Sequence, residues 1–395
     1  MTQADTSSNA PNDWAGVRRG QQRRPLEWLV EKGIFLVSLS AILMVFLIFL
    51  FVARESLPLV LGQVDASAAR IAMTLDQINA LPPPELAKLL DLSESELSQM
   101  QAVEPDTVKL LIEAKFEEIA VAPTDKDASI NPVAWRYLLR PHEWSGYTKP
   151  EYIWQPVSAI HKYNIIPLVV GSLKATLVAL LFSVPLSLGA AIYVSQLAAP
   201  RTRELIKPAI EMLAGIPSVV LGFFALIVMA SVLYPLYPDK SRLNAVVAGI
   251  ALGFAIIPVV FSIAEDALTS VPRSYTQAAL ALGASKWQAA WKVVLPAAIP
   301  GVFAAVVLGF GRAIGETMIV LMASGNASIM SLDLFDSVRT ITATIAAEMG
   351  EAVKGGDHYQ MLFLLGTLLF AVTFISNLVA DQIIHRLKAK MEGRA

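Results

Sequence analysis

The chain contains no cysteine and has few charged residues. Without cysteine it can form no disulfide, no thiol nucleophile and no thiolate metal site. Asp, Glu, Lys and Arg make up 16% of the 395 residues, whereas an average soluble domain has roughly 25%. Hydrophobic residues make up 55%. This balance is typical of an integral membrane protein.

Motifs of soluble enzymes are also missing. No Gly-Lys dipeptide occurs, so the chain has no Walker-type phosphate loop, and no G-x-S-x-G elbow is present. The four histidines lack H-E-x-x-H spacing, and we expect each to be a surface or interfacial residue: His142, His161, His358 and His385. The net charge of -2, with no basic block, gives no sign of a nucleic-acid partner. We therefore expect no enzyme activity, no catalytic residue, and no metal site or cofactor in this chain.

Apolar runs long enough to cross a bilayer occur six times. About 20 predominantly apolar residues are needed to span the hydrocarbon core as a helix. Proline within such runs is tolerated in bundled membrane helices. The sequence predicts an all-α integral membrane protein with six transmembrane helices, in the runs 34–52, 166–197, 206–233, 245–264, 294–322 and 361–384.

Positive charge beside the spans predicts the orientation. Lys and Arg gather in the tail 1–32, after the second span, and in the tail 386–395. Because cytoplasmic flanks carry this excess, both termini are predicted to be cytoplasmic. Residues 1–13 have the composition of a disordered segment. The first span, 33–53, is either an uncleaved helix or a signal peptide with Arg23-Arg24 as a twin-arginine lookalike, and the lack of an A-x-A-type site favours the helix.

A polar and acidic insertion, residues 54–165, separates the first two spans. Its first half has helical apolar spacing with Asp and Ser starts and Pro breaks, which predicts a small helical domain on the outer, extracytoplasmic face. Its second half is rich in aromatic residues. These either pack locally and anchor at the interface, or form a ligand-binding aromatic box. They are Trp135, Trp144, Tyr147, Tyr152 and Trp154.

The segment between the fourth and fifth spans, residues 270–301, is predicted to be cytoplasmic. Two short helical pieces flank Gly283, which can take the left-handed backbone of a turn. Small alanines before this glycine make a knob slim enough to enter a groove of another protein. The alternative is an amphipathic helix on lipid headgroups, helped by Trp287 and Trp291.

This segment resembles the cytoplasmic loop of importer-type ABC transporter permeases, E-A-A-x3-G-x9-I-x-L-P. Gln277 stands where that family has Glu, so a salt bridge from this position is not implied. The resemblance implies a type I importer permease fold with a core at 166–385, and a coupling loop at 271–293 that docks on separate ATPase subunits, which bind ATP and Mg²⁺. The matching residues are Gln277, Ala278, Ala279, Gly283, Val293, Leu295 and Pro296.

Three further stretches narrow the resemblance: LAGIPSVVLGFF at 213–224, GRAIGETMIVLMASGN at 311–326 and RTITATIAAEMGEA at 339–352. Together they resemble the phosphate-specific transport permeases, and the chain start is more similar to their C-type than to their A-type subunit. The resemblance implies a bacterial inner-membrane protein that pairs with a second related permease. Its other expected partners are a dimer of ATPase subunits, a periplasmic phosphate-binding protein and inorganic phosphate.

Two charged residues lie inside the fifth apolar run. Charge within a membrane span is rare and usually faces a pathway or a partner. We predict that Arg312, Glu316 and Thr317 line the substrate path, with Arg312 pairing with Glu316 one helical turn away when no anion is present. Gly311 and Gly315 form a G-x-x-x-G that would let a neighbouring helix approach. The alternative is a buried ion pair that only joins helices.

Two rival functions stay open. One keeps the class and changes the cargo to sulfate, molybdate or phosphonate, because the cytoplasmic loop would suit any of these. The other is a membrane scaffold or phosphate-sensing component in which the outer insertion is the working part. A plain anchor would not need a polar pair in a Gly-rich span.

Overall fold

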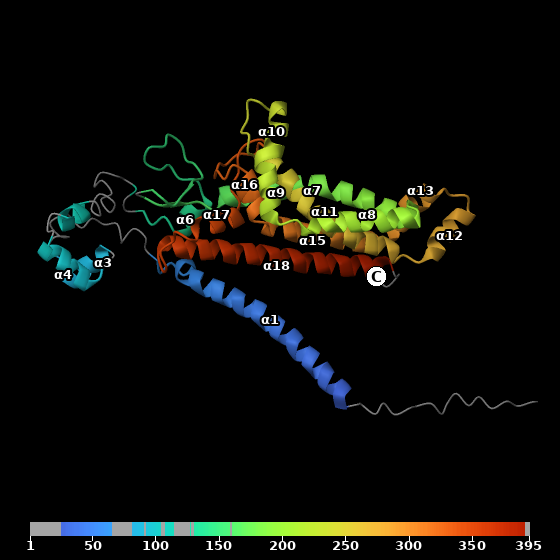
Figure 1. Ribbon diagram of the computed structural model, residues 1–395, viewed down its shortest axis with the longest axis horizontal. Helices are drawn as coiled ribbons and strands as arrows, with labels where there is room; N and C mark the ends of the chain where they lie inside the picture. The colour runs from blue at the N-terminus through green and yellow to red at the C-terminus, as the bar shows by residue number, and fades with distance from the viewer. Residues whose placement is uncertain are drawn as a thin grey trace, which may run out of the picture. The chain divides into compact units, whose positions relative to one another are not determined.

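The computed structural model describes residues 25–64, 81–90, 92–103, 107–113, 127, 130–158 and 160–391 (Figure 1). It divides between Phe51 and Val52 into two compact units. The first holds most of α1 (Pro25–Val60), a helix that extends beyond the predicted span 33–53 at both ends. Residues 34–52 of α1 are almost all apolar, as expected of a membrane-spanning helix. The predicted disordered segment 1–13 lies outside the described residues.

The second unit holds the remaining helices that are long and apolar enough to span a membrane. One span is formed by a bent pair, Lys286–Ala297 and Ile299–Gly315, whose axes differ by 73°. With this pair counted as one, the described residues contain six candidate spans, and the prediction of an all-α protein with six spans is confirmed. The other five are Val30–Val60, Ile166–Leu197, Ser218–Leu236, Ala245–Thr269 and Asp357–Leu387.

The third span starts later than predicted. Residues from 206 belong to a separate amphipathic helix, α8 (Pro200–Met212), followed by a 3-10 turn, Leu213–Gly215. Ile216 is extended, with φ -73° and ψ 123°, because proline disfavours a helical conformation in the residue before it. The span then begins with α9 (Ser218–Phe224) and continues through Ala225–Met229 and α10 (Ala230–Leu233).

The fifth span also ends earlier than predicted. α15 (Ile299–Gly315) ends where Glu316 becomes extended, with φ -72° and ψ 134°. A separate short helix, α16 (Met318–Ala323), follows. The run 294–322 is therefore not one helix. At its start, α14 (Leu295–Ala297) precedes the bend at Ala298.

The core of the second unit lies where α7 (Ile166–Ile192), α11 (Ala245–Thr269) and α15 pack together (Figure 1). Two glycines permit this close approach. A Cβ atom at Gly249 of α11 would lie 2.5 Å from the Cβ of Val178 on α7. A Cβ atom at Gly309 of α15 would lie 2.7 Å from a methyl group of Val260 on α11. Small residues at membrane helix contacts serve the same purpose generally.

The residues between the first two spans contain both helices and a short sheet. α3 (Pro83–Leu89), α4 (Glu94–Val103) and a helix at 107–113 share a small apolar core that includes Leu86, Leu97 and Val108. Residues 65–80 and 114–126 lie outside the described residues, so the helical structure predicted there stays a prediction. After α6 (Trp135–Leu139), strands β1 (Trp154–Gln155) and β2 (Lys162–Tyr163) form an antiparallel pair that was not predicted.

Two tryptophans of the second half of the insertion are buried in apolar clusters. Trp144 and Trp154 are each 3% exposed and belong to apolar clusters, whereas Trp135 is 45% exposed. The packing interpretation of these rings is thus supported for the two buried tryptophans.

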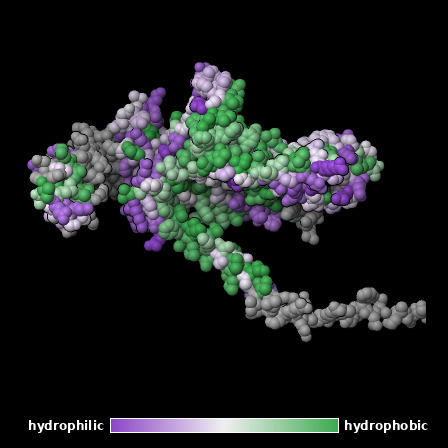
Figure 2. Space-filling view, in the orientation of Figure 1, coloured by the Kyte–Doolittle hydropathy of each residue, from purple (hydrophilic) through white to green (hydrophobic). Residues whose placement is uncertain are grey.

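The C-terminal part adds α17 (Ile341–Glu348) and the long α18 (Asp357–Met391). Hydrophobic surface covers α9 and its neighbours, and hydrophilic surface gathers around α12 (Arg273–Ala281) and α13 (Lys286–Ala289) (Figure 2).

Candidate functional site

Arg312 lies in the last turn of α15, with its side chain exposed in the single chain. Among the residues that the structure describes, it has no hydrogen bond or ion pair. Glu316 is turned elsewhere, because its Oε1 accepts hydrogen bonds from the backbone N–H groups of Thr317 at 3.1 Å and Met318 at 3.2 Å. The predicted pairing of Arg312 with Glu316 is wrong for this structure. The i,i+4 spacing needs a continuous helix, and α15 ends at Gly315.

The kink between α15 and α16 is held by short polar contacts. The Thr317 hydroxyl donates to the carbonyl of Gly315 at 3.4 Å, and the Thr342 hydroxyl of α17 donates to the carbonyl of Glu316 at 2.8 Å. The structure therefore brings Glu316 and Thr317 together in one polar break, with Arg312 one turn before it. A guanidinium in this position is available to an anion or to another chain.

The two glycines predicted to pack helices do so weakly. A Cβ atom at Gly311 would lie 3.9 Å from Asn377 Oδ1 of α18, which is an ordinary contact. A Cβ atom at Gly315 would meet nothing within 4 Å in the single chain. The tight helix contact of α15 is instead made at Gly309. Gly315 leaves room on an exposed surface of the chain.

The segment at 271–296 has the predicted form. α12 ends at Ala281, and Gly283 takes a φ of +86° that glycine adopts without strain. Ser285 then caps α13 in a capping box with Gln288. Of the predicted coupling residues, Gln277 and Ala278 are exposed and Ala279 is buried. Val293 and Leu295 are half-buried and Pro296 is exposed.

This segment exposes large apolar side chains. Leu282 is 90% exposed, next to the left-handed turn. The rings of Trp287 and Trp291 stack at a centroid distance of 5.8 Å, and both are exposed. Tyr275 and Leu280 are exposed as well. Large apolar side chains exposed within an otherwise hydrophilic surface make this segment a candidate interaction site.

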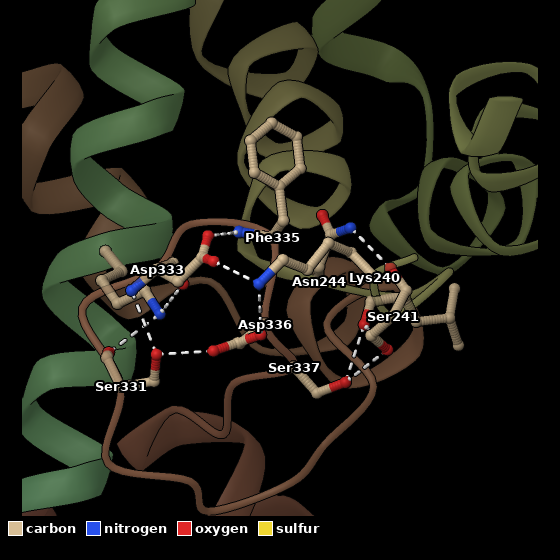
Figure 3. Close-up of polar contacts among 10 residues, drawn as sticks. Lys240, Ser241, Asn244, Ser331, Asp333, Phe335, Asp336 and Ser337 are labelled. Carbon is tan, nitrogen blue, oxygen red and sulfur yellow. Dashed lines mark hydrogen bonds and ion pairs between the residues drawn. The ribbon is translucent and has the colours of Figure 1, made fainter. Parts of the chain in front are cut away.

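A polar network surrounds Lys174, which no sequence motif marks. Lys174 of α7 is 7% exposed, and its Nζ donates to the carbonyls of Ser331 at 3.0 Å and Asp333 at 2.5 Å. Figure 3 shows Lys240 reaching the carboxylates of Asp333 and Asp336 beside this site. The hydrogen bond between Lys240 and Asp333, 2.7 Å long, raises the pKa of Lys240 and lowers that of Asp333. The network holds the loop between α16 and α17 against α7.

A second polar cluster is centred on Glu348. Its carboxylate accepts from Trp154 Nε1 at 3.2 Å and pairs with Arg339 at 2.8 Å and His358 at 3.5 Å. Burial raises the pKa of Glu348, while Arg339 and Trp154 oppose that rise. These contacts join the hairpin β1–β2 to α17 and α18. The stretch 339–352, quoted for its resemblance, thus supplies a structural ion pair.

Two of the four histidines are half-buried and share a neighbour, Tyr163. His161 Nδ1 lies 2.7 Å from Asp357 Oδ2, and the ring of His358 stacks on Tyr163 at 5.9 Å. Both belong to the half-buried region around Glu348, which no sequence spacing marks. In the part of the chain that the structure describes, no group of three or more His, Cys, Asp or Glu residues could hold a metal ion.

An apolar cavity of about 220 Å³ lies at the break before α9. It is bounded by the LAGIPSVVLGFF stretch on one side and by α11 on the other. Its lining carries no charged residue: Leu213, Ile216, Leu221, Phe224, Met229, Ala251 and Phe254.

Comparisons with known proteins identify the relatives of this chain. Residues 183–392 match the family described as binding-protein-dependent transport system inner membrane component. A probable ABC transporter permease protein, YqgH of Bacillus subtilis, is 34% identical over 60% of this chain and 76% of its own length. The phosphate transport system permease protein PstC of Xylella fastidiosa is 34% identical over 60% of this chain and 78% of its own length. A solved methionine ABC transporter, MetNI in inward facing conformations, is 17% identical over 56% of this chain and 94% of that chain, with a TM-score of 0.44.

The family match covers more than half of the chain, and the PstC relatives align over most of their own length. The predicted resemblance to ABC importer permeases, and to the C-type phosphate permeases among them, is thereby confirmed. The chain belongs to the family of binding-protein-dependent transport system inner membrane components.

Proposed function

We propose that this chain is a permease subunit of an ATP-driven importer of inorganic phosphate. Several curated relatives that are 32–34% identical to it are named as phosphate transport system permeases. In this proposal it pairs with a second related permease, and the two form the membrane path. A soluble binding protein delivers the anion at the outer face, and both termini lie in the cytoplasm.

The observation that carries the proposal is that the Arg312 side chain is exposed and has no ion pair in the described part of the chain. A guanidinium inside an apolar span is costly unless it meets a partner or a water-filled path. Within the described part of the chain no carboxylate neutralises Arg312, and its side chain is exposed on the single chain. Phosphate is an anion with several acceptor oxygens, which the planar fork of arginine matches in geometry and charge. Arg312 therefore supplies the positive charge for an anion in transit.

Glu316 and Thr317 have a different role in this proposal. The carboxylate of Glu316 is held by two backbone N–H groups at the start of α16. It stays close to Arg312 in the chain without neutralising it. A nearby negative charge keeps the site from binding phosphate so tightly that release fails. The Thr317 hydroxyl is a donor at the same break.

The segment at 271–296 would transmit the motion. Its exposed apolar side chains and its match to the coupling-loop pattern support docking on an ATPase subunit. ATP and Mg²⁺ would bind to those separate subunits, and this chain would not hydrolyse ATP. Movement of the docked segment would then change the side to which the path opens, which is alternating access.

Substrate competition tests the cargo. The complete transporter is expressed in cells that lack other phosphate uptake, and labelled phosphate uptake is measured with excess sulfate, molybdate or methylphosphonate. We expect uptake that only unlabelled phosphate reduces strongly. Uptake that sulfate, molybdate or the phosphonate suppresses as well as phosphate does would assign the chain to another oxyanion.

A further inference from the structure

A fully buried carboxylate lies near the end of α11. Glu265 is 0% exposed, and three side chains surround its two oxygens. Arg203 donates to Oε1 at 2.5 Å and Lys207 donates to Oε2 at 2.7 Å. The Thr269 hydroxyl donates to Oε1 at 3.0 Å. A buried ionised carboxylate with this many donors is stable only while the donors stay in place.

Both cations come from α8. No residue of α8 is fully buried, and its apolar contacts with the core are made by the half-buried Ile206 and Ile210. The ion pairs to Glu265 are the strong polar link between α8 and α11. The hydrogen bond to Glu265 is also the main cause of a raised pKa of Lys207, so this amine stays charged at neutral pH.

The two helices joined by this link lead to two other parts of the chain. α11 ends at Thr269, and α12 of the segment at 271–296 begins at Arg273. In the other direction, α8 leads through the turn Leu213–Gly215 and Pro217 into α9. α9 packs closely on α16, since a Cβ atom at Gly222 would lie 3.1 Å from the carbonyl of Met318.

We propose that Glu265 is a positioning residue that locks α8 to the end of α11, so that movement of the 271–296 segment reaches the 213–217 break and α9. This inference rests on the proposed transport function and adds the part that transmits the motion. Packed helices can slide past one another in a shear motion, and ion pairs to a buried carboxylate oppose such sliding more than the half-buried Ile206 and Ile210 alone would. With the link intact, α8 follows the end of α11. α16, whose first residues hold Glu316, follows α9.

The test compares Glu265→Gln with Asp266→Asn in the complete transporter reconstituted with its binding protein. Asp266 is the matched control, because its side chain is 72% exposed and lies 3.6 Å from Lys207. Gln keeps the size of Glu265 and removes its charge, and Arg203 and Lys207 can turn to solvent. We measure phosphate moved per ATP hydrolysed. The ratio is expected to fall at least tenfold in Glu265→Gln and to stay within twofold of native in Asp266→Asn.

A Glu265→Gln transporter that assembles and keeps the native ratio overturns the proposal. If that variant fails to assemble with the ATPase, Lys207→Met is measured instead, since Arg203 still neutralises Glu265 there. It is expected to assemble with a ratio at least threefold below native, and a native ratio again overturns the proposal. Failure of the proposed cargo is seen separately, in the native arm, as absence of phosphate transport.

Discussion

Replacing Asn244 by alanine removes the side chain that starts α11. Asn244 is 0% exposed, and its Oδ1 accepts hydrogen bonds from the backbone N–H groups of Val246 and Val247, each at 3.0 Å. Its Nδ2 donates to the carbonyl of Ser241 at 2.8 Å (Figure 3). The Asn244 side chain thus satisfies backbone hydrogen-bonding groups both at the start of α11 and in the loop before it.

The three backbone groups bonded to Asn244 are affected differently by its replacement. The N–H of Val246 also points to the carbonyl of Leu334 at 3.2 Å, so it keeps a partner in the variant. The N–H of Val247 and the carbonyl of Ser241 each lose the bond that Asn244 made. Loss of an N-cap costs about 1 kcal/mol, and a buried polar group left unpaired costs roughly 1–3 kcal/mol. The free energy of unfolding should therefore fall by about 2–4 kcal/mol.

The assay is unfolding of the purified chain in detergent, with native, Asn244→Ala, Asn244→Ser and Asp239→Ala compared. Serine restores a cap acceptor, so Asn244→Ser should recover about 1 kcal/mol of the loss. Asp239 is exposed in the same loop, and Asp239→Ala should stay within about 0.5 kcal/mol of native. An Asn244→Ala chain as stable as the Asp239→Ala control would refute the reasoning.

Three further predictions concern packing, ionisation and backbone conformation. Gly309→Val should destabilise the chain by about 1–3 kcal/mol through overpacking against α11, whereas Gly315→Ala, which meets open space, should change thermal stability little. Because burial raises the pKa of Glu348, the folded chain holds this proton more tightly than the unfolded chain, so stability falls as pH rises from about 4.3 through the folded pKa. Glu348→Gln should flatten that fall in thermal unfolding between pH 4 and 7, and an unchanged slope would contradict the assignment. Gly283→Ala places a Cβ at a φ of +86°, so it should weaken the turn by about 1 kcal/mol and reduce co-purification of the ATPase, with Ala284→Gly as the matched change that should not.

Local signals explain what could be predicted from the sequence. Apolar runs located the spans, and the spacing around Gly283 predicted two short helices with a left-handed turn, because hydropathy and turn conformation depend on neighbouring residues. The start of the third span was placed too early, because hydropathy alone does not separate α8 from α9. The end of α15 was missed. An i,i+4 spacing predicts a pair only where the helix continues, and Glu316 finds backbone N–H groups of the next helix instead.

Contacts between distant parts of the chain left no such signal. Lys174 lies in an apolar run just as Arg312 does, so it too is expected to face a partner or a pathway. Its acceptors are backbone carbonyls about 160 residues later in the chain. No residue pattern marks a carbonyl as an acceptor for a particular lysine. Glu348 and Trp154 are separated by a comparable length of chain. The folded arrangement was needed to find these pairs.

The most direct test of the central claim is phosphate uptake by the assembled transporter with Arg312→Gln. Loss of charge-assisted hydrogen bonds worth about 1.5–3 kcal/mol should lower uptake about tenfold to a hundredfold, while ATPase co-purification stays native. Arg312→Lys, which keeps the charge and loses the planar fork, should retain an intermediate rate. If the Arg312→Gln transporter assembles and takes up phosphate at the native rate, Arg312 does not serve the anion path and the account is contradicted.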